Sequence, residues 1–234
     1  MPSSFLSECK QKVLNRIESL LVNKDQITSS MRYSALADSK CIRAGLVFAS
    51  GKLEGQLDEV GLTDIATSIE LMHSYSLIHD DLPAMDDDGM RRGQPSNHVK
   101  FNEATAILAG DALQALAFET IASSKSITDA HKVEAVRMLA AACGHQGMVL
   151  GQQYDLDAEK NELLDIELIH SLKTAKLIQV ALTMPYLGNE MHKKTQVLLD
   201  SLGGKIGLAF QIMDDVLEVS SDTVTLGKSN LSDI

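Results

Sequence analysis

The run from Leu62 to Asp88 reads LTDIATSIELMHSYSLIHDDLPAMDDD and decides the fold class. Over 62–83 its apolar residues recur three and four positions apart, which is the spacing of an α-helix. The run then turns acidic, with five aspartates in the nine positions from Asp80 to Asp88. We therefore expect a helix of the protein core that carries a cluster of carboxylates at one end.

The same helical spacing recurs along most of the chain. It begins between Phe5 and Val22, and it predicts further helices over 34–52, 100–122, 130–154, 163–183 and 192–220. Short connectors separate the helical segments, over 23–30, 55–61, 86–97, 123–129 and 185–189. Because no internal repeat and no shift in composition divides the chain, we expect a single domain over 1–234.

The composition favours an all-α protein. The chain has only 4 Pro, no Trp, 5 Phe and 4 Tyr, whereas β-sandwiches and barrels need frequent turns and β-favouring side chains. A net charge of −11 disfavours nucleic-acid binding, since an acidic surface repels phosphate backbones. The 3 cysteines form no CxxC pair, no uninterrupted apolar run has the length of a membrane span, and the first residues do not form a signal peptide. These features predict a cytoplasmic protein.

A second acidic group lies near the end of the chain. Asp214 and Asp215 have mostly apolar neighbours, and Glu218 follows Asp214 by four positions, which places these two on one face of a helix. Adjacent carboxylates on an apolar helix repel one another unless a cation lies between them. Oxygen ligands without nitrogen or sulfur suit Mg²⁺, which completes its coordination with waters and substrate phosphates.

Basic residues accompany the first acidic cluster and favour a phosphate ligand. Arg91 and Arg92 follow the cluster directly, and Lys40, Arg43 and Lys173 are further candidates. Two facing carboxylate clusters with such cations would hold a diphosphate through Mg²⁺. The alternatives are a solvated acidic loop at the first cluster and a capping or ion-pairing role for the second. Neither cluster has the ligand pattern of a calcium-binding loop.

These motifs together resemble the short-chain trans-polyprenyl diphosphate synthases, most closely the bacterial farnesyl diphosphate synthases. The segment from Leu77 to Asp86, followed by Arg91-Arg92-Gly93, is similar to the first aspartate-rich motif of that family, and 207–215 is similar to the second. The lesser blocks that match in order are Ile107–Gln114, Gly151-Gln152 with Asp155-Leu156, and Lys173-Thr174. The resemblance covers nearly the whole chain.

The resemblance implies a fold, a reaction and partners. The fold is an all-α, isoprenoid synthase-type helical bundle around a central cavity, usually a homodimer, and this chain would lack the family's C-terminal helices. The reaction is the head-to-tail condensation of isopentenyl diphosphate with dimethylallyl or geranyl diphosphate, which releases pyrophosphate and gives farnesyl diphosphate. The alternatives are a geranyl or geranylgeranyl diphosphate synthase and a catalytically degenerate subunit of the same fold. A terpene cyclase and a helical interaction protein are disfavoured.

Carried over by position, the resemblance also assigns site residues. Mg²⁺, with three ions expected per site, would be held by Asp80, Asp81, Asp86, Asp214, Asp215 and Glu218. The allylic substrate would be contacted by Arg91, Lys173, Thr174, Gln211 and Lys228, and isopentenyl diphosphate by Lys40, Arg43, His73 and Arg92. The residues expected to be catalytic are Asp80, Asp86, Lys173 and Asp214.

Two motifs depart from the family pattern. The block Gly-Gly-Lys-Arg-x-Arg-Pro appears here over 38–44 as Asp-Ser-Lys-Cys-Ile-Arg-Ala. It keeps Lys40 and Arg43, but it has Asp38 in place of a glycine and Cys41 in place of an arginine. The second aspartate motif ends in Glu218 instead of an aspartate.

Two further expectations concern geometry. Asp80 and Asp86 are six positions apart, or ~240° around an ideal helix, so both can hold one metal only if the helix ends or bulges near Pro83. Tyr75 lies five positions before Asp80, and in the resembled family an aromatic residue there forms the floor of the product pocket. Such a floor would stop chain growth at C15, and the alternative is a core tyrosine with a hydrogen-bonded hydroxyl.

Overall fold

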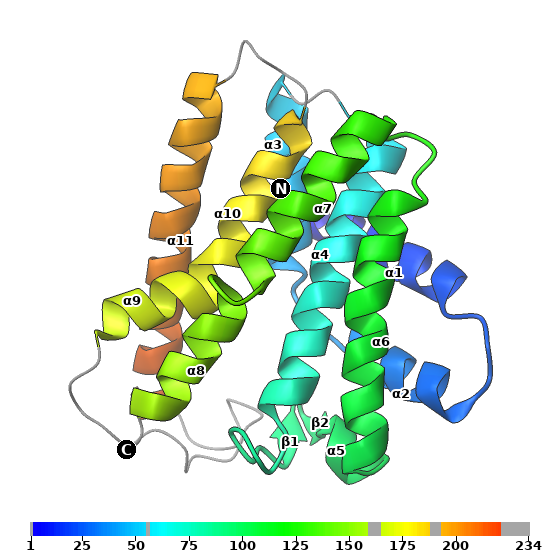
Figure 1. Ribbon diagram of the computed structural model, residues 1–234, viewed down its shortest axis with the longest axis vertical. Coiled ribbons are helices and arrows are strands. Elements are labelled where there is room, and N and C mark those ends of the chain that lie inside the picture. Colours follow the sequence, from blue (N-terminus) through cyan, green and yellow to red (C-terminus); the bar gives the residue numbers. More distant parts are fainter. Residues whose placement is uncertain (1, 55–56, 159–164, 188–192, 221–234) are drawn as a thin grey trace.

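The computed structural model describes residues 2–54, 57–158, 165–187 and 193–220, and most of them are helical (Figure 1). The α-helices are α1 (Pro2–Leu20), α2 (Gln26–Ala35), α3 (Ile42–Glu54), α4 (Glu59–Asp80), α5 (Asn97–Lys100), α6 (Glu103–Ala122), α7 (Asp129–Cys143), α8 (Met148–Ala158), α9 (Ile166–His170), α10 (Lys176–Thr183) and α11 (Lys193–Ser220). A π-helical turn, η1 (Ser171–Ala175), precedes α10, and a 3-10 turn, η2 (Met184–Tyr186), follows it. Strands β1 (Met90–Arg91) and β2 (Gln94–Pro95) form one hairpin. The prediction of an all-α protein is confirmed.

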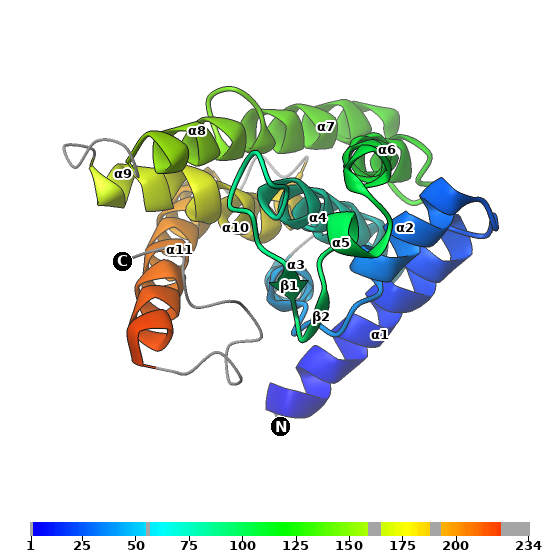
Figure 2. The same cartoon turned by 90° about the horizontal axis from the view of Figure 1, so that it is seen from below.

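Helix α4 is the centre of the bundle. It packs most extensively on α6, and also on α3, α1 and α2. Figure 2, which looks along the bundle from below, shows neighbouring helices around α4. Its buried residues accordingly point in all directions and include Leu62, Ile65, Ile69, Leu71 and Met72. A helix that is apolar on every side is stable only inside a core, which is why this stretch of sequence dominates the fold.

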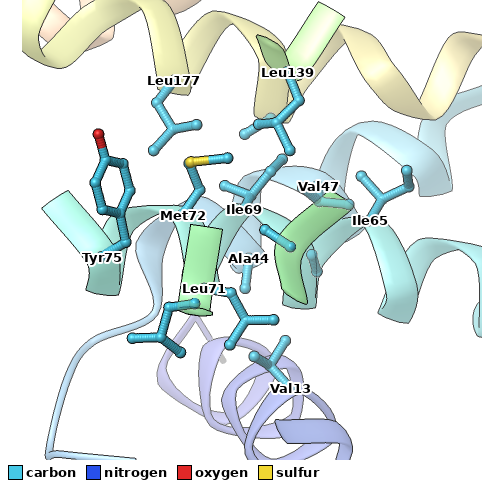
Figure 3. Packing of buried hydrophobic residues seen from close by; sticks show 14 of the residues in the cluster. Val13, Ala44, Val47, Ile65, Ile69, Leu71, Met72, Tyr75, Leu139 and Leu177 are labelled. Atoms are coloured by element: carbon cyan, nitrogen blue, oxygen red, sulfur yellow. The ribbon is translucent and has the colours of Figure 1, made fainter. Parts of the chain in front are cut away.

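The core spreads outward from α4 through one connected group of apolar side chains. Figure 3 shows Met72 of α4 pointing toward Leu177 of α10, whereas Leu71 points the other way, toward Val13 of α1. All four side chains are essentially buried. Burial of each such side chain stabilises the fold by roughly 1.5–3 kcal/mol, so these contacts fix α4 against helices on both of its sides.

The helix predicted over 34–52 is divided in the structure. Helix α2 ends at Ala35 and α3 begins at Ile42, so the predicted segment contains a turn. Helix α2 also begins inside the first predicted connector, because the Asp25 side chain caps it by accepting a hydrogen bond from the Thr28 amide at 2.8 Å. Asp25, which lies in the connector predicted over 23–30, is therefore a helix-capping residue.

One later prediction of a single helix is corrected in the same way. The segment over 130–154 is divided between α7 and α8, where Gly144 and Gly147 interrupt the helical pattern. The helix predicted over 163–183 is continuous from Ile166 to Thr183, with the π-helical turn between α9 and α10. Helical spacing alone does not predict the break between α7 and α8, because apolar residues continue at the same spacing on both sides.

Within the described residues, α6 is the one helix whose length and apolar composition would allow it to cross a membrane. That match is weak, because the core helices of globular proteins meet the same criterion. Helix α6 packs on α4, α2, α7 and α5, and Ala106, Ala109 and Leu113 are fully buried in these contacts.

Candidate active site

The first acidic cluster lies where α4 ends. The helix stops at Asp80, and the chain then folds back so that the Asp86 amide donates a hydrogen bond to the Asp80 carbonyl at 2.9 Å. The Met85 amide donates to the Leu82 carbonyl at 2.8 Å and tightens the same loop. The predicted end of the helix near Pro83 is confirmed. It returns Asp86 to the helix end that carries Asp80.

The surroundings of Asp80 disfavour its charged form. Burial and the negative charges of Asp86 and Asp81 raise the pKa of Asp80 to about 7, although two nearby cations oppose the rise. A carboxylate with a pKa raised in this way gains more than an ordinary one from an added cation. Asp80 and Asp86 therefore form a pair whose negative charge the surrounding protein does not fully balance.

Asp81 lies in a different environment from Asp80. It is buried, and its Oδ1 accepts hydrogen bonds from Nε of Arg91 at 2.8 Å and from an Nη of the same guanidinium. Arg91 also pairs with Asp88 at 3.0 Å. One guanidinium therefore joins two carboxylates of the loop and stabilises its folded-back shape. The predicted role of Asp81 as a metal ligand stays a prediction.

Helix α8 and the π-helical turn η1 bring a cation against this acidic cluster. Lys173 of η1 forms an ion pair with Asp155 of α8, and its charge also acts on Asp80 and Asp86. Burial alone would lower the pKa of Lys173, but the neighbouring carboxylates outweigh burial and raise it. Lys173 is therefore charged at neutral pH and is positioned to balance an anion at the cluster.

The close approach of α8 to η1 depends on Gly151. A Cβ at this position would lie only 2.6 Å from Cα of Lys173, so a larger residue would push the two segments apart. The next residue, Gln152, donates from Nε2 to Oδ1 of Asp86 at 3.0 Å. Its Oε1 is buried and has no hydrogen-bond partner among the described residues. Helix α8 thus contacts both the lysine and the acidic cluster.

Helix α11 is the second element that meets η1. The Thr174 hydroxyl donates a hydrogen bond to Oε1 of Gln211 at 3.0 Å, which joins two of the residues predicted to contact the allylic substrate. The backbone places Asp214, Asp215 and Glu218 further along α11. Their side chains lie outside the described residues, and so does Lys228. The prediction that they complete the metal site therefore stays a prediction.

The hairpin that follows the acidic loop presents Arg92. Arg91 is paired with Gln94 across the hairpin, so Arg92 and Gly93 form a two-residue loop with φ of +54° and +75°. Such a loop needs positive φ at both positions, which glycine adopts freely and arginine only at a cost. Backbone strain of this kind is concentrated at functional sites.

Arg92 belongs to a basic cluster with Arg43 and His73. Burial lowers the pKa of His73 well below its ordinary value, and the charges of Arg43 and Arg92 lower it further. His73 is therefore neutral at physiological pH, and the two guanidiniums carry the charge. Such a group suits a diphosphate, because arginine binds phosphate oxygens bidentately and a neutral imidazole can donate one hydrogen bond. Lys40, the fourth predicted member, is exposed just before α3.

The two unusual residues of the Lys40 block differ in exposure. Asp38 is exposed and pairs with Lys10 of α1 at 2.5 Å, so its charge is already neutralised. Cys41 is buried, with φ of +46°, and its Sγ lies 3.1 Å from the Ser39 hydroxyl. The added acid therefore does not leave an unbalanced negative charge beside the arginines.

Tyr75 continues the row of α4 core residues beyond Met72 (Figure 3). Its exposed fraction is 8%, and its ring meets that of His79 edge-on with centroids 5.1 Å apart. Burial raises the pKa of its hydroxyl, and the side chain of Gln114 counteracts part of this rise. Tyr75 is therefore a buried aromatic residue about one and a half turns from Asp80, which agrees with both of its sequence interpretations.

Three residues that contact the site are absent from the predicted set. Gln152 and Asp155 lie in a block that matches the resembled family, so the sequence did contain a signal for them. Asp88 belongs to a run of three aspartates, and nothing in the sequence distinguishes it from Asp86 or Asp87. Its pairing with an arginine on the following hairpin depends on how the loop folds.

The described residues fit a magnesium ion. Among them, no three acidic, histidine or cysteine side chains converge as a complete metal site. Mg²⁺ does not require one, because it is commonly held by one or two carboxylates, waters and substrate phosphates. Asp80 and Asp86 supply two carboxylates, and the buried Oε1 of Gln152 is an acceptor suited to a metal-bound water.

Comparison with known proteins agrees with this geometry. The family model described as polyprenyl synthetase matches residues 24–234. The chain therefore belongs to the polyprenyl synthetase family.

Individual relatives support the same class. A farnesyl diphosphate synthase of Escherichia coli strain K12 is 43% identical over 97% of this chain and 78% of its own length. That of Haemophilus influenzae is 42% identical over 89% of this chain and 72% of its own length. The chain thus spans about three quarters of these relatives.

Solved structures share the fold. A geranyltransferase from Legionella pneumophila has a TM-score of 0.88 at 39% identity, over 94% of this chain and 80% of its own. A geranyltransferase from Helicobacter pylori, in complex with magnesium and isoprenyl diphosphate, has a TM-score of 0.83 at 33% identity, over 98% of this chain and 79% of its own. The fold and the enzyme class, a prenyltransferase, are those indicated by the sequence motifs.

Proposed function

We propose that this protein condenses isopentenyl diphosphate with dimethylallyl and geranyl diphosphate to give farnesyl diphosphate and pyrophosphate. The observation that carries the proposal is the distribution of charge along α4. A carboxylate pair lies near Lys173 at the end of the helix, and the basic cluster of Arg43, Arg92 and His73 lies about two turns before it. Two diphosphate substrates need two such subsites. The relatives named farnesyl diphosphate synthase support the identity of the product.

On the allylic side, the chain holds and neutralises the leaving diphosphate. Mg²⁺ bound at Asp80 and Asp86, with three ions proposed per site, would supply positive charge to the leaving group as its C–O bond breaks. Lys173 adds a fixed positive charge beside the same carboxylates. Thr174 and Gln211, already hydrogen-bonded to each other, offer neutral contacts to the diphosphate. Arg91 acts through the loop that it holds together.

On the isopentenyl side, Arg43, Arg92 and His73 bind the second diphosphate, with exposed Lys40 at the edge of the subsite. The arginines orient the substrate so that its double bond faces the allylic carbon, which removes much of the entropic barrier of a two-substrate reaction. No protein nucleophile is required, because the attacking group is the double bond of the substrate. The proton lost after bond formation leaves with the released pyrophosphate.

The test is identification of the product. The purified protein is incubated with isopentenyl diphosphate, dimethylallyl diphosphate and Mg²⁺, and the dephosphorylated products are separated by chromatography. We expect a C15 product that depends on all three components. A C10 or C20 product would instead identify a geranyl or geranylgeranyl diphosphate synthase, and no product would identify a catalytically degenerate subunit.

We further propose that Tyr75 forms the floor of the product pocket. It is buried, and it lies on the same helix as Asp80, about one and a half turns closer to the middle of α4. Tyr75→Ala should lengthen the main product to C20 or more, while the first condensation continues at nearly the normal rate. Products of unchanged length from an active variant would leave Tyr75 as an ordinary core residue.

The proposed assembly is a homodimer in the cytoplasm, without a membrane span. Helix α6 presents an exposed apolar face to solvent, on which Ile107 and Leu108 are 43% and 54% exposed. A second copy of the chain would cover this face. Leu108→Glu should then convert a dimer into a monomer in size-exclusion chromatography with light scattering. A monomeric parent protein would contradict the proposal.

A further inference from the structure

A buried carboxylate faces the basic cluster and has no role in the site described so far. Glu70 lies on α4 one turn before His73, and only 6% of it is exposed to solvent. Burial of an acidic side chain is costly unless hydrogen bonds or cations compensate its charge. The partners of Glu70 therefore indicate its function.

The first partner is the beginning of α3. The Ala44 amide donates a hydrogen bond to Oε1 of Glu70 at 2.9 Å. The first bond within α3 runs from the Gly45 amide to the Cys41 carbonyl at 3.0 Å, so the Ala44 amide belongs to the first turn, which lacks intrahelical acceptors. Glu70 thus caps α3 from a neighbouring helix. The family block quoted above has proline at position 44, and proline would offer no N–H for this contact.

The second partners are two arginines from different segments. Burial raises the pKa of Glu70, and the charge of Arg43, followed by that of Arg92, counteracts it. Arg43 lies in the first turn of α3, and Arg92 lies in the strained loop of the hairpin. Burial lowers the pKa of Arg92, and Glu70 is the largest influence in the opposite direction. One carboxylate of α4 therefore interacts with α3 and with the hairpin.

We propose that Glu70 is a positioning residue of the isopentenyl diphosphate subsite, which fixes the first turn of α3 and holds Arg43 and Arg92 close together before the substrate binds. This inference rests on the proposed function, which assigns the two arginines to that subsite. Two guanidiniums repel each other, and the carboxylate between their segments offsets the repulsion. Without it, binding of the substrate must also bring the arginines together, which weakens affinity.

The test is the variant Glu70→Gln, which keeps an oxygen acceptor for the Ala44 amide but removes the charge. Steady-state kinetics are measured with each substrate varied while the other is saturating. We expect KM for isopentenyl diphosphate to rise about tenfold, whereas kcat and KM for the allylic substrate change less than about twofold. Glu70→Asp keeps the negative charge but shortens the side chain by one methylene. Its KM for isopentenyl diphosphate should therefore rise only about threefold.

The matched control is Asp64→Asn. Asp64 is also a buried carboxylate of α4, and it pairs with Arg16 of α1 at 2.9 Å, away from the basic cluster. This variant should lower the melting temperature but leave both KM values unchanged, because it removes a buried charge that is not paired with Arg43 or Arg92. It separates a positioning effect from a general loss of stability.

An unchanged KM for isopentenyl diphosphate in folded Glu70→Gln would overturn the proposal. A fall in kcat together with an equal rise in both KM values would overturn it as well. If Glu70→Gln does not fold, the same measurement is made on Glu70→Asp, and an unchanged KM for isopentenyl diphosphate in that variant overturns the proposal. Arg92→Gln distinguishes the two levels of the argument: if it raises KM for isopentenyl diphosphate and Glu70→Gln does not, only the role of Glu70 is refuted. If neither variant changes KM, the assignment of the subsite fails as well.

Discussion

The two charged regions along α4 balance their charge in opposite ways. In the acidic cluster, Asp80 and Asp86 act on each other, and the pKa of Asp80 is raised to about 7 because burial and like charges outweigh the nearby cations. In the basic cluster, the charges of Arg43 and Arg92 act on a carboxylate that the protein itself provides, Glu70. The first region has an excess of charge that an added cation can balance. The second is assembled before its ligand arrives.

This difference agrees with the two modes of diphosphate binding proposed above for the two clusters. A site that works through a metal must leave its carboxylates incompletely compensated, because fully paired carboxylates would not attract the ion. A site that binds the anion directly gains from arginines that are already in place. Asp81 is a fully paired carboxylate within the same acidic loop, and its pairing with Arg91 stabilises the shape of that loop.

The largest expected effect tests the acidic cluster. Asp80→Ala and Asp86→Ala should each lower kcat by about 10³-fold or more at saturating Mg²⁺, because each removes a carboxylate proposed to hold the Mg²⁺ that stabilises the leaving diphosphate. Circular dichroism should show that both variants remain folded. Asp129→Ala, at an exposed aspartate at the start of α7, is the control and should keep full activity. Near-normal turnover of both cluster variants would contradict the assignment.

The next effect concerns the contact that brings Lys173 to the carboxylates. Gly151→Ala places a Cβ against the backbone of Lys173, and we expect a loss of about 3 kcal/mol in the free energy of unfolding, with a marked loss of activity. Gly89→Ala is the control, because no atom lies within 4 Å of the added Cβ. Urea denaturation and kinetics measure both effects. Equal stability of the two variants would show that α8 can move away from η1 without cost.

A smaller effect separates two adjacent aspartates. Asp81→Asn should destabilise the metal-free protein by about 2 kcal/mol, because it weakens a buried pair with Arg91 while Asp88 remains as a partner. Asp80→Asn should not destabilise the metal-free protein, since it relieves repulsion within the cluster. Chemical denaturation in the presence of a chelator provides the measurement. If both variants lose stability equally, the two carboxylates are not in different electrostatic environments.

The smallest effect is an opposite pH dependence of the two regions. The folded-state pKa of Asp80, about 7, lies above the ordinary value near 3.9, so the folded protein binds this proton more tightly and loses stability as pH rises from about 4 to 7. The pKa of His73 is depressed instead, so stability is lost as pH falls below about 6.5, where the unfolded chain takes up the proton.

Two variants measure these contributions. Asp80→Asn should raise the melting temperature of the metal-free protein more at pH 8 than at pH 4.5, by roughly 5 °C. His73→Gln should raise the melting temperature of the metal-free protein only at acidic pH, near pH 5. Thermal melts in a chelator over this pH range test both. A shift that does not vary with pH in either variant would refute the corresponding electrostatic environment.

Much of the site was predictable from the sequence because its residues lie in short, ordered blocks. The spacing of Asp80 and Asp86, together with Pro83, predicted that α4 ends before Asp86, and the structure confirms it. Tyr75 was placed correctly relative to Asp80 because the two lie on one helix. The division of 34–52 into two helices was not predictable in this way, because apolar residues continue at helical spacing on both sides of the turn between α2 and α3.

The sequence by itself determined the fold class, the family and the identity of the charged residues, because helical spacing and motif order are properties of neighbouring positions. Only the tertiary structure decided how those charges are shared. It paired Asp81 with Arg91 and placed Glu70 against Arg43 and Arg92, which are contacts between α4, α3 and a hairpin. The physical reason is that burial and electrostatic interaction depend on distances in space, and residues far apart in the chain become neighbours only when the helices pack.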